Sequence, residues 1–310
     1  MNYNWIKYVA KISDDHTSII FYDSFNQKIE PNTFPENLST FIFGYRFNQI
    51  IEPNTLPENL SNLTFGSQFN KKIKPNTLPK NLTNLTFNFS FNRKIRPNTL
   101  PEKLTTLTFG FYFNQKIELN TLPEKLTNLT FGSCFNQKIE PNSLPTKLTT
   151  LTFGWNFNQK IEPNSLPEKL TTLTFGKCFN QNIEPISLLE NLTTLTFGWY
   201  FNQNVENILN KIKYINFNWL NENPAYFKKD IGIINNIPRY YNVKIYVDNN
   251  IFDKCKPKWP IHVVNYNETY WPSDIYEIID KHIDPIYGDI TVLINKESYE
   301  PYSHNKSAIK

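Results

Sequence analysis

Histidine and cysteine, the residues that most often act as bases, nucleophiles or metal ligands, are scarce in this chain of 310 residues. It has four His and three Cys, and no zinc-binding, phosphate-loop or nucleophile-elbow motif occurs. Asp280, His282 and Asp284 are close in sequence, but at a helix end we interpret them as a solvated charge cluster. The sequence therefore predicts no enzyme, no metal and no cofactor. A catalytic C-terminal region would require a deep cleft near His262 or His282.

The composition also limits where the protein acts. No apolar run approaches the ~18 residues of a membrane span, and the N-terminal segment lacks the apolar core of a secretion signal. Three Cys do not make a disulfide framework. We therefore expect a cytoplasmic, monomeric protein that does not bind membranes.

The strongest signal in the sequence is an internal repeat. The dipeptide Phe-Asn recurs at equal intervals of 22 residues, at Phe25, Phe47, Phe69, Phe91, Phe113, Phe135, Phe157, Phe179 and Phe201. With this Phe as position one, eight full units run from Phe25 to Tyr200. A half unit at 16–24 precedes them, and a ninth, degenerate unit ends at Asn218.

Each unit is predicted to form a strand, a bend and an irregular return. In unit seven, residues 170–175 alternate apolar residues with Thr, as a half-buried strand does. Gly176 follows, and we expect it to adopt a positive φ. Pro163 and Pro167 exclude a regular helix on the return path. Six side chains are predicted to point inward: Phe157, Ile161, Leu166, Leu170, Leu173 and Phe175.

A single unit cannot fold alone. Six buried side chains contribute roughly 1.5–3 kcal/mol each, whereas ordering each residue of the backbone costs about 1–2 kcal/mol. Stacking resolves this deficit because each strand then pairs with the next, so the sequence predicts a repeat β-solenoid with one parallel strand per 22-residue rung. The Asn after each first Phe is expected to bond to backbone groups in the turns. Cys134 and Cys178 share a unit position two rungs apart, too far for a disulfide, so we expect free thiols.

The motifs L-x-x-L-x-F, F-N-x-x-I and L-P-x-x-L resemble leucine-rich repeats, and more specifically the FNIP-repeat family of social amoebae and giant amoeba-infecting viruses. The resemblance covers residues 16 to about 218. It implies a leucine-rich-repeat-like scaffold for protein–protein interaction, in the host cytoplasm if the protein is viral. Many members carry an F-box that recruits a ubiquitin ligase. Only about 15 residues precede the half unit here, too few for an F-box, so the ubiquitin-adaptor role is the weaker interpretation.

The N-terminal segment is predicted to cap the repeats. Trp5, Tyr8, Val9 and Ile12 fall on one face of a helix. Residues 1–24 are therefore expected to form a cap of a short helix and the half repeat, with His16 as a cap residue, ahead of the repeat domain at 25–218.

Residues 219–310 are expected to form a small α/β region, either a C-terminal cap or a second domain. Helices are predicted from Asn223 to about Asn235 and from Ser273 to Ile283. Strands are predicted at 243–247 and 290–294.

Comparison of the units isolates two positions that vary while the scaffold does not. These are the last two positions of each unit, which follow the strand and its Gly, and we call them the variable edge. Large aromatic residues and cations recur there, as they do in interface hot spots, although packing between rungs is the alternative role. The candidate binding residues are Tyr45, Arg46, Phe89, Phe111, Tyr112, Trp155, Lys177, Trp199 and Tyr200.

Units three and four carry a run of cations without an acid, which we call the basic patch. It consists of Lys71, Lys72, Lys74, Lys80, Arg93, Lys94 and Arg96. Like charges on adjacent rungs repel, so an acidic partner would relieve the repulsion, and a merely solvated face is the alternative. Two hypotheses follow: a protein partner at the variable edge, or a nucleic acid or other polyanion at the basic patch. Columns of Thr on the strand face suggest ice or glycan binding as a further function. The alternative is that Thr is simply a good solvent-facing strand residue.

Overall fold

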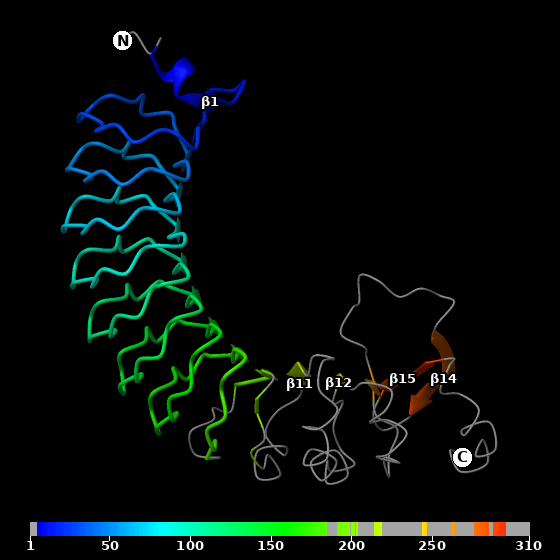
Figure 1. Ribbon diagram of the computed structural model, residues 1–310. Coiled ribbons are helices and arrows are strands. Elements are labelled where there is room, and N and C mark those ends of the chain that lie inside the picture. Colours follow the sequence, from blue (N-terminus) through cyan, green and yellow to red (C-terminus); the bar gives the residue numbers. More distant parts are fainter. Residues whose placement is uncertain are drawn as a thin grey trace.

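The computed structural model describes residues 5–184, 191–198, 200, 201 and 203, and the course of the backbone at 214–218, 244–246, 262–263, 276–284 and 288–295. The repeats form a stack of coils, one coil per unit. Figure 1 shows that the stack bends into an arc with its short strands on the inner, concave side.

Each unit contributes one strand to a continuous sheet. In chain order the elements are the 3₁₀ helix η1 (Ile6–Tyr8) and the strands β1 (Ala10–Ile12), β2 (Ser18–Phe21), β3 (Thr40–Ile42), β4 (Asn62–Thr64), β5 (Asn84–Thr86), β6 (Thr106–Thr108), β7 (Asn128–Thr130), β8 (Thr150–Thr152), β9 (Thr172–Thr174), β10 (Thr194–Phe197), β11 (Tyr214–Asn218), β12 (Lys244–Tyr246), β13 (His262–Val263), β14 (Tyr276–Asp284) and β15 (Gly288–Asn295). Strands β2 to β13 pair in chain order and in parallel. Leu173 lies beside Leu151 and Leu195, one unit away on either side. The predicted β-solenoid and its 22-residue register are therefore confirmed.

The core is built from equivalent side chains stacked rung on rung. All six predicted inward residues of unit seven are buried, none more than 4% exposed. Two columns of Phe dominate this core: the Phe that follows each strand and the first Phe of the next unit. Their rings stack with centroids 3.7–3.9 Å apart within a rung, as in Phe153 and Phe157. Contacts between aromatic rings add to the hydrophobic contribution of ring burial.

A ladder of Asn side chains connects the turns, as the sequence predicted. The Asn at position two accepts a hydrogen bond at Oδ1 from the backbone N–H of the same Asn one rung later. For example, Asn136 Oδ1 lies 2.9 Å from the backbone nitrogen of Asn158. Seven consecutive links of this kind span 2.8–3.1 Å. The Asn therefore pairs backbone groups that no strand reaches.

Hydroxyl groups form a second ladder just before the strands. The Ser or Thr at position fifteen donates its hydroxyl to the carbonyl of the same position one rung earlier, as Thr171 does to Thr149 at 3.1 Å. Equivalent bonds of 3.0–3.1 Å link the rungs from Ser39 to Thr193. Each rung is thus locked to its neighbour at both ends of the strand.

The prediction of positive φ at the glycine after each strand is wrong. None of these glycines lies in the left-handed region. A Cβ added to Gly132 would instead overlap the carbonyl oxygen of Gly110 on the preceding rung, so glycine is required by close approach of backbones. Within the repeat units, the described left-handed residues are the Asn at position eight, with φ of 59–62°: Asn32, Asn54, Asn76, Asn98, Asn120, Asn142 and Asn164. Asn tolerates this conformation better than most residues.

The N-terminal cap differs from the predicted helix. From Trp5 onward only η1 is helical, and β1 follows it and pairs antiparallel with β2. A helix through Ile12 would leave the outer backbone groups of β2 without partners, whereas β1 satisfies them. Tyr8, predicted to face the repeats, is 84% exposed. Trp5 does contact the first rung, with its ring stacked 6.4 Å from that of Phe25.

The C-terminal region contains both predicted strands, and a third strand where one of the two helices was expected. The predicted strands at 243–247 and 290–294 coincide with β12 and β15. The predicted helix from Ser273 to Ile283 is wrong, because β14 pairs antiparallel with β15 over this segment. The spacing of the Ile residues in this segment is consistent with a helix or a strand. Pairing with the apolar strand β15 favours the strand. The helix expected at 223–235 lies outside the described residues.

We expect Phe153→Ala to lower the free energy of unfolding by about 3–5 kcal/mol. Phe153 is 2% exposed, and its ring contacts those of Phe157, Phe131 and Phe175, so truncation leaves a cavity between rungs. Denaturant titration checks the value, with the exposed Lys147→Ala as control, expected to change stability by less than about 0.5 kcal/mol. A cost below about 1 kcal/mol for Phe153→Ala would contradict the assigned core.

Buried hydroxyls at position nine give a second test. Thr99 is 2% exposed and its Oγ1 has no hydrogen-bond partner, whereas Ser165 Oγ, at the same position, donates to the Glu162 carbonyl at 2.7 Å. Replacing an unpaired hydroxyl by a methyl removes a desolvation cost. Thr99→Val should leave thermal stability unchanged or raise it, while Ser165→Ala should cost about 1 kcal/mol. A destabilised Thr99→Val protein would show that the hydroxyl is paired.

Candidate functional site

The variable edge begins where each strand on the concave side ends (Figure 1). Its backbone is fixed by a further ladder, in which the last residue of each unit donates its N–H to the carbonyl of the penultimate residue one rung earlier. Tyr112 donates to Phe89 in this way at 2.9 Å, and Cys178 donates to Trp155 at 2.8 Å. The edge therefore offers variable side chains on a regular, rigid backbone.

The large side chains of the variable edge are exposed. The exposed fractions of Tyr45, Phe89, Phe111, Tyr112, Trp155 and Tyr200 are 53%, 47%, 41%, 47%, 51% and 43%. Arg46 is exposed and Lys177 is half-buried. Trp199 lies outside the described residues. Among the described residues, the aromatics of this edge are thus surface groups and not core.

Phe89, Phe111 and Tyr112 form one aromatic cluster on adjacent rungs. The rings of Phe89 and Phe111 stack with centroids 4.8 Å apart, and the Tyr112 ring stands edge-on to both, at 4.9 and 5.1 Å. We call this the Phe–Tyr cluster. It is a preformed apolar surface, because its rings already restrict one another.

Trp155, Lys177 and Tyr200 form a second group on successive rungs. The Lys177 Nζ lies 4.3 Å from the Trp155 ring centroid and 5.8 Å from that of Tyr200. The cation lies over the faces of the rings, the favourable geometry for a cation–π interaction. The group therefore combines an apolar surface with a positive charge.

The structure separates these two groups and places Tyr45 and Arg46 apart from both. Ser67 and Gln68 lie between Arg46 and the Phe–Tyr cluster, and the half-buried Ser133 and Cys134 lie between the cluster and Trp155. The edge is thus one continuous line of positions with aromatic and small polar segments in alternation.

The described residues contain no arrangement suited to metal binding, since no group of three or more His, Cys, Asp and Glu comes together among them. The side chains of His262 and His282, on β13 and β14, lie outside the described part of the chain. Cys134 and Cys178 are both free thiols, as predicted. No helix among the described residues is long and apolar enough to cross a membrane.

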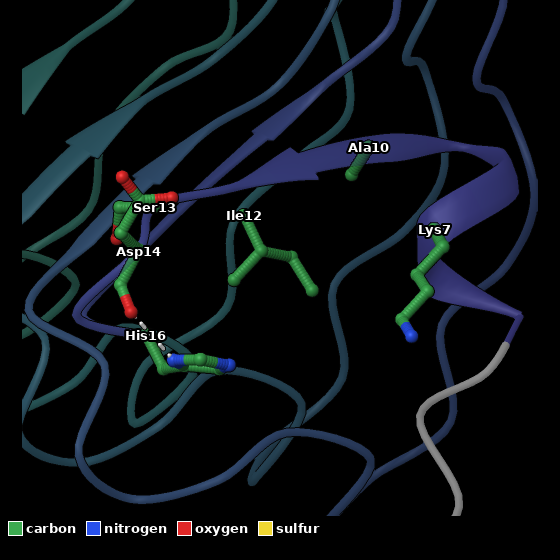
Figure 2. A pocket seen from close by; sticks show the side chains of 6 residues that line it. All are labelled: Lys7, Ala10, Ile12, Ser13, Asp14 and His16. Atoms are coloured by element: carbon green, nitrogen blue, oxygen red, sulfur yellow. Dashed lines mark hydrogen bonds between the residues drawn. The ribbon is translucent and has the colours of Figure 1, made fainter.

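An open hollow in the N-terminal cap lies between η1 and the turn after β1. Figure 2 shows its lining: Lys7, Ala10, Ile12, Ser13, Asp14 and His16. His16 adopts a φ of 57° in that turn, and its Nδ1 lies 2.9 Å from the Asp14 carbonyl. Hydrogen bonds from the Ser13 hydroxyl and from the N–H and hydroxyl of Thr17 lower the pKa of Asp15. These polar groups shape the turn, and we assign the hollow no chemistry.

The basic patch lies beyond the variable edge along the coil. Lys71 is half-buried and the other six cations are exposed. Lys74 forms an ion pair with Glu52 at 3.5 Å and Lys94 forms one with Glu118 at 2.6 Å, both with acids of flanking units. The Arg93 Nε donates to the Asn70 carbonyl at 3.0 Å.

Two regular contacts of this surface escaped the sequence analysis. The Lys at position four pairs with the Glu at position six one rung later, as in Lys94–Glu118, Lys116–Glu140 and Lys138–Glu162. The Gln at position three donates from Nε2 to Oδ1 of the position-two Asn one rung earlier, as Gln137 does to Asn114. The recurrence of Gln, Lys and Glu at these positions in most units was the available signal. Each contact joins a residue to a partner in the neighbouring unit, so the recurring residue types alone do not show which residues meet.

The parallel strand and irregular return of each rung make the molecule a leucine-rich-repeat-like solenoid. The FNIP Repeat model matches residues 14–46, 47–90, 69–112, 91–134, 113–154 and 135–178, more than half of the 310 residues. The chain therefore belongs to the FNIP repeat family.

A solved structure supports the same fold. The chain is similar to CroV588 of the giant virus CroV, described as a novel circular LRR protein, with 41% identity and a TM-score of 0.58. The similarity covers 74% of this chain and 38% of CroV588, so the chain spans well under half the length of that protein. No match was found among curated proteins.

The ladder of ion pairs predicts a pH-dependent contact. A hydrogen bond from Lys116 and its charge lower the pKa of Glu140 below its ordinary value of 4.5. Because this pKa is depressed in the folded state, the ionised pair stabilises the fold at neutral pH, and the contribution is lost as the pH falls through the folded pKa. Lys116→Gln should raise the Glu140 pKa in an NMR titration of its carboxyl group. Lys147→Gln should leave it unchanged, and an unshifted pKa in Lys116→Gln would show that the pair does not persist in solution.

Proposed function

We propose that the protein is a non-enzymatic, cytoplasmic scaffold that binds a protein partner through the variable edge. If the chain is viral, the cytoplasm is that of the host. The observation that carries the proposal is the row of six large aromatic side chains, each at least 41% exposed, on a backbone fixed by the rung-to-rung ladder.

A structural role for these aromatics is less well supported. The core is already filled by two Phe columns, and Ser67 and Ser133 occupy the same position as Phe89 and Trp155 without interrupting the backbone ladder. The rung therefore tolerates a small polar residue there. Exposed aromatic side chains desolvate readily and lose little conformational entropy, which favours their use in recognition.

Trp155→Ala should weaken partner binding by at least ~2 kcal/mol, about thirtyfold in affinity, with little change in melting temperature. Trp155 is half exposed and contacts Lys177, so truncation removes both an apolar anchor and the surface that positions the cation. The measurement takes the full chain as bait in a lysate of the cells that contain it, followed by calorimetric titration of the identified partner.

Tyr8→Ala is the matched control, because Tyr8 is more exposed than Trp155 and lies in the cap, away from the edge. It should bind the partner as wild type does. Normal binding by Trp155→Ala, Phe111→Ala and Tyr200→Ala would refute the variable edge. A captured nucleic acid whose binding weakens steeply with salt would instead favour the basic patch as a polyanion site.

A further inference from the structure

Units three and four depart from their own repeat at two surface contacts at once. At position three, Gln braces the Asn ladder in six described units, through bonds of 2.9–3.1 Å from Nε2 to the Asn Oδ1. Lys71 and Arg93 replace this Gln. At position six they carry Lys74 and Arg96 in place of the acid that the neighbouring units use.

The second departure places like charges where other rungs have ion pairs. Lys94 and Glu118 are 2.6 Å apart, and Lys116 and Glu140 are 3.0 Å apart. One rung earlier, the same two places carry two cations, Lys72 and Arg96, in place of an ion pair. Lys74 still pairs with Glu52, and Arg93 still donates to the Asn70 carbonyl. The side chains of Lys71, Lys72 and Arg96 have no such partner among the described residues, so scaffold contacts do not explain these three cations.

The cations of unit four follow the first ring of the Phe–Tyr cluster closely along the chain. Arg93 comes four residues after Phe89, so their Cα atoms are at most about 14 Å apart. Phe89, at the end of unit three, is the first ring of the cluster. Stacked aromatic rings and exposed cations therefore lie within the reach of one short peptide.

We infer that this junction binds a short acidic segment of a partner protein, with an apolar residue on the Phe–Tyr cluster and carboxylates on Lys71, Lys72, Arg93 and Arg96. The inference rests on the proposed function and names the chemistry of its partner. Planar guanidinium groups bind carboxylates in bidentate fashion, and the acids would give Lys72 and Arg96 the partners that they lack among the described residues.

The charges around the junction favour a short segment over a nucleic acid. Along the stack, Glu52 precedes the basic patch, and Glu118, Glu140 and Glu162 follow it at the same position. A polyanion laid along the rungs would meet these carboxylates within about 5–10 Å of the patch, and their repulsion opposes a long row of phosphate contacts. The patch therefore suits a short segment, and the aromatic rings nearby suit an apolar side chain.

The test begins with selection of random peptides displayed on phage against the full wild-type chain at ~0.15 M salt. We expect the selected peptides to be enriched in Asp and Glu beside an aromatic or aliphatic residue. A selected pool without acidic enrichment, or a selection that enriches no peptide, would overturn the inference.

The selected peptide is then titrated against two variants with the same change in net charge. Lys71→Gln, Arg93→Gln and Arg96→Glu together restore the repeat's own residues at position three of both units and at position six of unit four, so this variant should melt no lower than wild type yet bind about tenfold more weakly. The control, Lys125→Glu with Lys147→Glu, alters exposed cations outside the patch and should bind within about twofold of wild type. Equal weakening by both variants would show general charge attraction and overturn the inference.

Two further measurements separate this inference from the proposed function. Phe89→Ser with Phe111→Ser should also weaken the peptide by about tenfold. If these substitutions weaken binding and the charge variant does not, the inferred acidic ligand is wrong and the variable edge remains the proposed binding site. If neither variant weakens binding, the acidic ligand and the variable edge are both refuted. A single-stranded thymidine oligonucleotide that binds more tightly than the selected peptide would identify a nucleic-acid surface instead.

Discussion

The backbone of each rung is paired mainly with the same or the adjacent unit position of the neighbouring rungs, and the rest of the structure depends on that pairing. The strands, the position-two Asn, the position-fifteen hydroxyls and the N–H groups of the variable edge all bond one unit along the chain. Such bonds form together only if every rung has the same length. The glycine after the strand belongs to the same constraint, since a Cβ on Gly132 would overlap the Gly110 carbonyl and force the rungs apart.

This constraint divides the unit into two classes of position. Residues that touch the adjacent rung must match it, so the Phe columns and the Asn ladder repeat almost without change. Residues that point outward escape the constraint, and their variation then reports something other than folding. At the variable edge both conditions meet, because a fixed backbone holds side chains as different as Ser133 and Trp155. A binding surface on such a frame changes its chemistry without changing its geometry, which is why repeat scaffolds suit recognition.

Much of the fold was predictable because periodicity carries both the element type and the register. The six inward positions of unit seven, the parallel strands and the free thiols of Cys134 and Cys178 all follow from position within the unit. The exposure of Trp155 could not be predicted from its position in the unit, because an aromatic residue after a strand can either face solvent or pack between rungs. The reason for the glycine after each strand was predicted wrongly. Conformational propensity considers only the φ of the glycine itself, whereas the contact that requires glycine is with the backbone of the residue 22 positions earlier. At the ends the repeat no longer fixes the partner, so helical spacing at Trp5–Ile12 and at Ser273–Ile283 competed with strand pairing and lost.

The repeat also supplies an internal reference for interpreting charge. A cluster of surface cations alone says little, because isolated Lys and Arg side chains are well solvated. Here the neighbouring units show what the scaffold prefers at the same places: a Gln that braces Asn114 or Asn136 and a Glu that pairs with the preceding Lys. Units three and four lack the Gln at position three and the acid at position six, and they carry four cations there instead: Lys71, Arg93, Lys74 and Arg96. A loss of scaffold contacts that is confined to adjacent rungs, has one sign of charge and adjoins exposed aromatic rings is better explained by a ligand than by drift, because drift would scatter these changes along the stack.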